Sequence, residues 1–158
     1  MKLALTLLIV LLCGHAGYAQ TRSILFAGNS FTYGAGSAVH FYRADTVTDL
    51  DAEGIGGVPA LFKSFTQQAG LDYDVYLETR GGSGLEFHLE NKLGVIGQRP
   101  WDIVVMHGQS TLDFDKPGDP AKLIATSKQL AEGFHQRNRK IEMRLMATWS
   151  RACQTYPS

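Results

Sequence analysis

The sequence predicts an α/β fold built on a parallel β-sheet. Short apolar runs typical of buried strands alternate along the chain with longer segments whose apolar residues recur at helical spacing. Each apolar run is followed by glycine or small polar residues, which are common where a strand ends in a loop. Strands that alternate with helices form βαβ units, whose strands run parallel within one sheet.

The expected strands are apolar runs separated by helical segments. The first, Ile24-Leu25-Phe26-Ala27, is uninterrupted and therefore predicts a strand that is buried. Residues 35–57 form the one long segment without a clear period, and we expect them to be an irregular surface loop near the functional site. The four strands are predicted at residues 24–27, 73–77, 103–106 and 141–147.

Three amphipathic segments predict the helices. In the first, Pro59 suits an opening turn and Gly70 suits a C-cap, while Leu61, Phe62, Phe65 and Ala69 share one face. In the third, a long helix, we expect Leu123, Ile124, Leu130, Ala131 and Phe134 to face inward. The expected helices cover residues 59–69, residues 85–96 and a segment that opens at Asp119-Pro120.

Composition limits the classes of function. The 158 residues include 44% hydrophobic and 19% charged residues, which is ordinary for a globular domain with its own core. The formal net charge is zero, so nothing indicates a nucleic acid or an anionic surface as partner. The sequence contains no H-E-x-x-H motif and no paired cysteines, so we expect no protein-bound metal and no cofactor.

Residues 1–19 have the pattern of a secretory signal peptide. Lys2 gives a basic start, an apolar run ends at Cys13, and small residues up to Ala19 suit cleavage before Gln20. A membrane anchor is the alternative, but the run is short for a stable membrane span. We therefore expect an exported protein, periplasmic or extracellular, whose domain begins at residue 20. Cleavage also removes Cys13, so Cys153 has no partner for a disulfide within this sequence.

The strand ends carry the residues with chemical potential. Gly28-Asn29-Ser30 follows the first strand, and similar glycine-containing or polar stretches follow the others: residues 80–84, 107–110 and 148–151. In an open α/β sheet, ligands bind at the carboxyl ends of the strands. A hydroxyl, free backbone N–H groups and a carboxamide would meet at this edge. Acyl transfer requires a nucleophilic oxygen and donors for the developing oxyanion, and these groups supply both.

Gly28-Asn29-Ser30-Phe31-Thr32 resembles the first block of the SGNH hydrolases, the GDSL-type esterase superfamily. The resemblance extends in order and spacing over most of residues 20–158, which would be the N-terminal portion of such a domain. It implies a flavodoxin-like three-layer α/β/α sandwich. It also implies that Ser30 is the nucleophile and that its own N–H is an oxyanion donor. The further oxyanion donors it implies are the N–H of Gly82, with Gly84 as the alternative, and the side-chain amide of Gln109.

The acid–base pair of these hydrolases, Asp-x-x-His, has no match in the sequence. None of the four histidines after residue 19 has Asp three positions earlier. His135 is expected to be solvated on the long helix. His107 ends a strand at the active edge and is expected to be structural or substrate-facing, with a role as general base as the alternative. The resemblance thus predicts that this chain lacks the pair, together with the last strand and helix.

Two classes of function remain open at this stage. The first is an exported serine esterase that hydrolyses acyl esters of small molecules or carbohydrates, with Asn29, His107 and Trp149 as possible substrate-facing residues. The second is a non-catalytic ligand-binding protein, or an inactive fragment, on the same scaffold. Trp101 and Trp149 fit either a sugar-binding cleft or core packing. The sequence specifies neither the acyl group, nor the alcohol, nor the oligomeric state.

Overall fold

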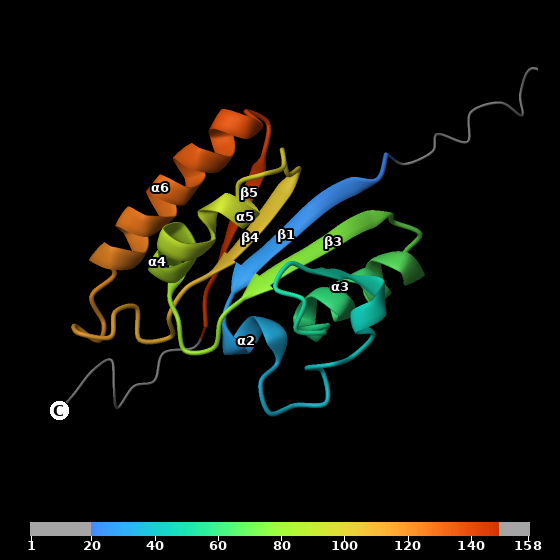
Figure 1. Cartoon of the computed structure of the whole chain (residues 1–158), viewed down its shortest axis with the longest axis horizontal. Helices are drawn as coiled ribbons and strands as arrows, with labels where there is room; N and C mark the ends of the chain where they lie inside the picture. The colour runs from blue at the N-terminus through green and yellow to red at the C-terminus, as the bar shows by residue number, and fades with distance from the viewer. Residues whose placement is uncertain (1–19, 149–158) are drawn as a thin grey trace, which may run out of the picture.

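The computed structural model describes residues 20–148, and the central feature of this part of the chain is a five-stranded parallel sheet. The strand order is β2-β3-β1-β4-β5, with helices on both faces (Figure 1). The α/β fold with a parallel sheet is thus confirmed. The strands are β1 (Arg22–Gly28), β2 (Thr48–Asp49), β3 (Tyr73–Thr79), β4 (Ile103–His107) and β5 (Glu142–Met146).

The helices divide between the two faces of the sheet. One face is covered by α3, and the other by α4, α5 and the long α6 (Figure 1). A short helix, α2, follows β1 directly at the carboxyl edge of the sheet. The α-helices are α2 (Ser30–Tyr33), α3 (Gly57–Gln68), α4 (Leu85–Phe87), α5 (Leu93–Ile96) and α6 (Ala121–Arg137); a 3₁₀ turn, η1 (Ala44–Thr46), and a π-helix, η2 (His88–Lys92), complete the set.

The segment 35–57 is more ordered than the sequence indicated. It contributes β2, which is the fifth strand and pairs with β3 at one edge of the sheet. Asp49 organises the turn after β2, because its Oδ2 accepts hydrogen bonds from the N–H groups of Glu53 and Ile55 at 2.9 and 3.1 Å. Ile55 is then buried in the core on the α3 side. The prediction of an irregular surface loop was therefore wrong for this part of the segment.

The expected helix over residues 85–96 is divided into three pieces. The π-helix η2 separates α4 from α5, although the leucine spacing suggested one continuous helix. Three apolar residues expected on buried or shared helix faces also lie in solvent: Phe65 is 63% exposed, Ile124 is 49% exposed, and Ala69 is exposed as well. The buried residues of α3 are small ones instead, among them Ala60 and Ser64.

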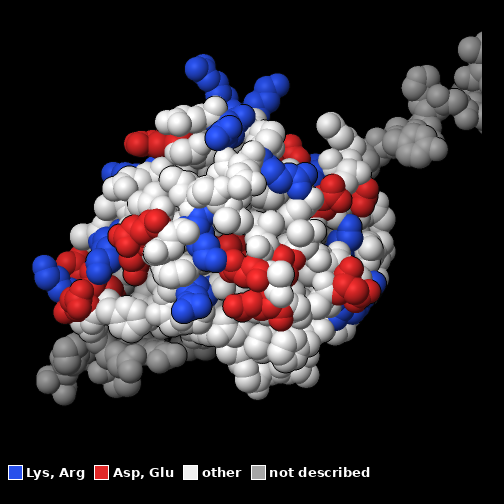
Figure 2. Space-filling model, viewed as in Figure 1, with Lys and Arg blue, Asp and Glu red and all other residues white. Residues whose placement is uncertain are grey.

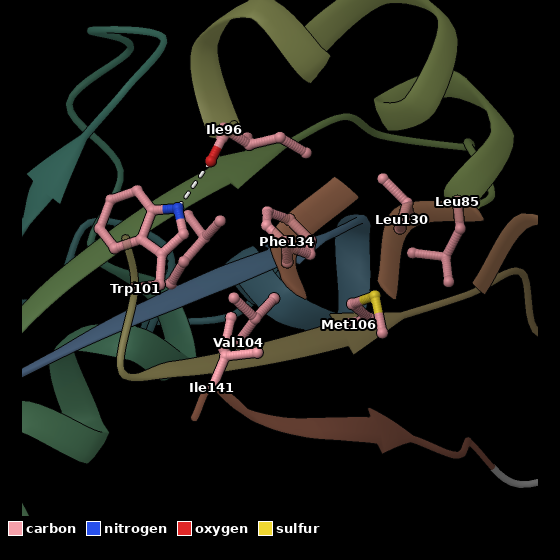
Figure 3. Close-up of a cluster of buried hydrophobic side chains, with 9 residues drawn as sticks. Leu85, Ile96, Trp101, Val104, Met106, Leu130, Phe134 and Ile141 are labelled. Carbon is pink, nitrogen blue, oxygen red and sulfur yellow. Dashed lines mark hydrogen bonds between the residues drawn. The ribbon is translucent and has the colours of Figure 1, made fainter. Parts of the chain in front are cut away.

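The larger core cluster lies between the sheet and the helices α4, α5 and α6 (Figure 3). Trp101 is 1% exposed there, and its Nε1–H donates to the carbonyl oxygen of Ile96 at 2.6 Å. Of the two interpretations of Trp101, core packing is therefore the one that the structure supports. The buried members of the cluster are Leu25, Leu85, Ile96, Trp101, Val104, Met106, Leu130, Phe134 and Ile141.

The strand register brings the carboxyl ends of β1, β3 and β4 to one edge. Gly28 lies opposite Thr79 in β3, and Ala27 lies opposite Met106 in β4. The segments that follow these three strands therefore start side by side.

No helix within residues 20–148 is both long enough and apolar enough to cross a bilayer.

Gly28 allows α2 to pack directly against the end of the sheet. A Cβ at this position would lie 2.1 Å from Oγ1 of Thr32 and 3.0 Å from Cβ of His107. Both distances are shorter than a van der Waals contact, so any side chain would push α2 away from the strand ends. The glycine that opens the Gly28-Asn29-Ser30 stretch is thus required by packing.

We predict that Gly28→Ala lowers the free energy of unfolding by about 1–3 kcal/mol, the usual cost of inserting a methyl group into a filled site. Urea unfolding followed by circular dichroism measures this. Gly94→Ala is the matched control, because a Cβ there meets no atom within 4 Å and should not destabilise the protein. Equal stabilities for wild type and Gly28→Ala would contradict the packing argument.

Candidate active site

A pocket of about 520 Å³ lies at the carboxyl edge of the sheet. Its lining comes from the segments after β1, β3 and β4, as expected for an open α/β sheet. Apolar side chains form part of the wall, and amides and hydroxyls form the rest. The lining residues are Asn29, Ser30, Phe31, Gly82, Gln109, Ser110, Thr111, Phe114 and Pro117.

Ser30 is the first residue of α2 and is partly exposed in the pocket. Within residues 20–148, neither its hydroxyl nor its backbone N–H takes part in a hydrogen bond. The first N–H groups of a helix have no partner inside the helix, so the N–H of Ser30 is free to serve a ligand. Both groups that the resemblance assigns to Ser30 are thus available at the pocket.

Asn29 connects the three segments that form the pocket. Its Nδ2 hydrogens donate to the carbonyl oxygens of Ser83 and Gly108 at 3.1 and 2.9 Å. Its Oδ1 accepts the N–H of Phe31 at 3.2 Å and so caps α2. The residue is 3% exposed. Because both amide hydrogens are already used, the structure favours a role in holding the loops over the substrate-facing role considered for Asn29.

The glycine-rich loop after β3 contains both candidates for a backbone donor. Gly82 lines the pocket with φ +71°, in the left-handed region that favours glycine, and its N–H has no partner within residues 20–148. Gly84 is buried at the N-cap of α4 and does not line the pocket. Of the two, Gly82 is therefore better placed to donate to a ligand near Ser30.

Gln109 brings a side-chain amide to the pocket from the segment after β4. It is partly exposed, and within the described residues its side chain makes no hydrogen bond. The backbone carbonyl oxygen of Gln109 accepts a hydrogen bond from the N–H of Leu112 at 3.0 Å. This bond fixes the backbone, while the side-chain amide has no partner among the described residues. An amide in this position is able to donate to a bound carbonyl oxygen.

Part of the pocket wall was not predicted from the sequence. Phe114 and Pro117 form an apolar side of the pocket. Thr111 also lines it, and its buried hydroxyl has no hydrogen-bond partner among the described residues. All three follow β4 in the segment before α6. The only signal for them was their position after the His107–Ser110 stretch, because loop residues carry no periodic pattern that assigns them to a pocket.

His107 lies beneath α2 and does not line the pocket. It is 4% exposed, and its Nδ1 is 3.1 Å from Oγ1 of Thr32. Burial lowers the pKa of His107, because the charged imidazolium would lose its hydration. These contacts support a structural role. Trp149, the other candidate for substrate contact, lies outside the described residues.

No ionisable side chain lines the pocket in the described part of the chain. The described residues also hold no group of three or more His, Cys, Asp or Glu that could bind a metal ion. Acidic and basic side chains are mixed over the face of the molecule shown in Figure 2. His135 is exposed on α6, as the sequence predicted, and it does not line the pocket.

Comparison with known proteins gives one structural similarity to report. A solved structure titled "Crystal Structure of TesA" has a TM-score of 0.58 and 16% sequence identity to this chain. The alignment covers 78% of this chain and 59% of the TesA chain, so this chain spans less than two thirds of the length of the TesA chain. At this level of identity the likeness shows the fold alone, and it agrees with the α/β fold described above. No family model matches the sequence. No curated protein matches it either.

We predict that His107 makes the protein less stable as the pH falls. Its pKa is lower in the folded protein than in the unfolded chain, where it is about 6.5. The unfolded state therefore binds the proton first, and stability present above pH 6.5 is lost as the pH falls below it.

Urea unfolding at pH 7.5 and pH 5 should show a smaller loss of stability for His107→Gln than for wild type. His135→Gln, an exposed histidine on α6, is the matched control and should keep the wild-type difference. If His107→Gln loses as much stability between the two pH values as wild type does, the buried imidazole is not responsible.

Proposed function

We propose that this protein is a serine esterase of SGNH type that is exported and hydrolyses acyl esters. The observation that carries the proposal is the convergence of Ser30 with two unused backbone N–H groups and one unused side-chain amide on a single pocket. Such a combination is what acyl transfer requires, because the nucleophile and the oxyanion donors must reach the same carbonyl group.

The reaction would proceed in two steps. The Ser30 hydroxyl attacks the ester carbonyl carbon and gives its proton to a general base. Negative charge then develops on the carbonyl oxygen, where the N–H groups of Ser30 and Gly82 and the amide of Gln109 would donate. Collapse of this intermediate breaks the bond to the alcohol, which leaves with the proton. Water then repeats the sequence on the acyl–serine and releases the acid.

The general base is not among the described residues that line the pocket. A serine hydroxyl is a weak nucleophile at neutral pH and needs a base within hydrogen-bond reach. His107 ends β4 nearby, but its Nδ1 faces Thr32 beneath α2. We therefore propose that the acid–base pair lies outside the described residues and resembles the Asp-x-x-His pair of the hydrolases that the sequence resembles.

The pocket favours substrates without charge next to the scissile bond. Its lining contains no Lys, Arg, His, Asp or Glu within residues 20–148. A charged group bound there would lose hydration without gaining a partner of opposite sign. Phe31, Phe114 and Pro117 offer apolar contact to an acyl group. Esters of neutral alcohols, including acylated sugars, suit this lining.

A second candidate is a non-catalytic ligand-binding protein on the same scaffold. The observation in its favour is the absence of a titratable side chain near Ser30 in the described part of the pocket. Under this alternative the amide and hydroxyl groups would bind a neutral ligand, and no acyl–serine would form.

The two candidates differ in the reactivity of Ser30. Hydrolysis of p-nitrophenyl acetate should be measured for residues 20–158 and for the product of the coding sequence read to its stop codon. We expect Ser30-dependent turnover in the second form, with at least roughly a thousandfold less in the first, because loss of a general base removes most of the rate. A fluorophosphonate probe should label Ser30, as mapped by mass spectrometry.

Ser110→Ala is the matched control for Ser30→Ala, because Ser110 lines the same pocket. Only Ser30→Ala should abolish turnover and labelling. Turnover that survives Ser30→Ala, or a label on another residue, would contradict the assignment. Equal Ser30-dependent turnover in the two forms would place the base inside this chain, and His107 would be the first residue to replace.

A further inference from the structure

A buried carboxyl–imidazole pair lies outside the pocket, on the side of the sheet covered by α4, α5 and α6. Glu78 is the penultimate residue of β3, and His88 is the first residue of the π-helix η2. A hydrogen bond joins Nδ1 of His88 and Oε2 of Glu78. Both side chains are 0% exposed. The pair therefore cannot contact a ligand in the pocket directly.

The pair joins the two ends of the glycine-rich loop. The chain leaves β3 at Thr79, passes through residues 80–84 and returns in α4 to His88. At the tip of this loop, the carbonyl oxygen of Ser83 accepts a hydrogen bond from Asn29. Gly82 lies between these two attachments, and its N–H has no partner of its own within residues 20–148. The direction of the Gly82 N–H therefore depends on the contacts that hold the loop, namely the Glu78–His88 pair and the hydrogen bond from Asn29 to Ser83.

An ion pair holds the other end of the π-helix. Lys92, the last residue of η2, is 2.5 Å from Oδ1 of Asp51 in the turn after β2. The first and last residues of this five-residue helix therefore contact two different parts of the sheet edge. A π-helical turn inside an α-helix is rare and often marks a functional site. Here it places His88 against β3 at the end of α4, the helix that follows the loop.

The pair is costly for a purely structural contact. Glu78 Oε1 and His88 Nε2 are buried without hydrogen-bond partners in the described structure. Well-packed apolar residues at such positions are often at least as stabilising as a buried ion pair. Buried polar pairs have their best-attested use in specifying one arrangement of the chain. A loop whose N–H must point at a reacting atom requires that kind of specification.

We propose that Glu78 and His88 are positioning residues that fix the loop of residues 80–84 and thereby the direction of the Gly82 N–H. Neither residue touches the substrate. The inference rests on the proposed function for the role of Gly82, while the fixing of the loop can be measured without any reaction.

The variants exploit the two nitrogens of imidazole. Asn places its amide N–H near the position of Nδ1, which contacts Glu78, whereas Gln places its amide near the position of Nε2. His88→Asn should therefore preserve the contact, and His88→Gln and Glu78→Ala should remove it. Phe134→Leu, a substitution in the same core cluster but on α6, is the control for general destabilisation.

Two measurements are made on the product of the coding sequence read to its stop codon, the form in which Ser30 is expected to react. Native-state hydrogen–deuterium exchange of peptides covering residues 80–85 reports the loop, and the rate of Ser30 labelling by a fluorophosphonate at saturation reports the oxyanion donors. We expect His88→Gln and Glu78→Ala to raise loop exchange about tenfold, the consequence of losing one buried hydrogen bond. We expect them to slow labelling without weakening probe binding, while His88→Asn and Phe134→Leu stay within about threefold of wild type.

Unchanged loop exchange in His88→Gln and Glu78→Ala would overturn the proposal, and so would an equal rise in Phe134→Leu. A His88→Asn variant that behaves like His88→Gln would also overturn it, even if other variants fold poorly. Raised exchange with an unchanged labelling rate would overturn the positioning of Gly82. Absence of Ser30 labelling in every protein, with raised exchange, would refute the proposed function while supporting the fixed loop.

Discussion

The side-chain amide of Asn29 is the interaction on which the rest of the site depends. Three strands end at one edge of the sheet, but parallel strands pair only up to their ends, and the segments beyond them have no shared ladder of hydrogen bonds. Asn29 supplies the missing connection. It donates to Ser83 in one segment and Gly108 in another, and it caps the helix that carries Ser30.

Each residue of Gly28-Asn29-Ser30 accordingly has one physical task. Gly28 lets α2 approach the sheet, because any Cβ would meet Thr32 and His107. Asn29 joins the loops, and Ser30 lies at the pocket with its hydroxyl and N–H unused within the described residues. The buried strand β1 runs directly into the partly exposed Ser30 because the short helix α2 begins at this residue. Asn29 caps α2, and Thr32 packs against the strand ends, so Ser30 lies at the edge of the sheet.

Sequence alone predicted the parts of the fold whose residues carry a period or an uninterrupted apolar run. The strands containing Ile24 and Ile103 could be recognised because both of their faces are buried. The strand β2 could not, because two residues are too few to show a pattern. The helix over residues 85–96 was predicted as continuous because of its leucine spacing. That spacing carries no information about the π-helix η2, which begins at His88 where this residue contacts Glu78.

The candidate site was predictable to the same degree. Ser30, Gly82 and Gln109 could be found because each follows a predicted strand, and the structure brings all three to one pocket. Phe114 and Thr111 could not be found, since the path of a loop depends on tertiary contacts. A structural role for His107 was one of three that the sequence left open, beside substrate contact and general base, and its burial against Thr32 favours the structural role.

Hydrogen–deuterium exchange of Asn29→Asp tests the central claim most directly. Asp has nearly the shape of Asn but cannot donate when ionised, so the carbonyl oxygens of Ser83 and Gly108 lose their donor together. The account predicts that peptides covering residues 80–84 and 108–112 both exchange faster, while peptides from β1 and α6 keep their protection. An increase in only one of the two loops, or a uniform increase over the whole chain, would contradict the claim that Asn29 holds the site together.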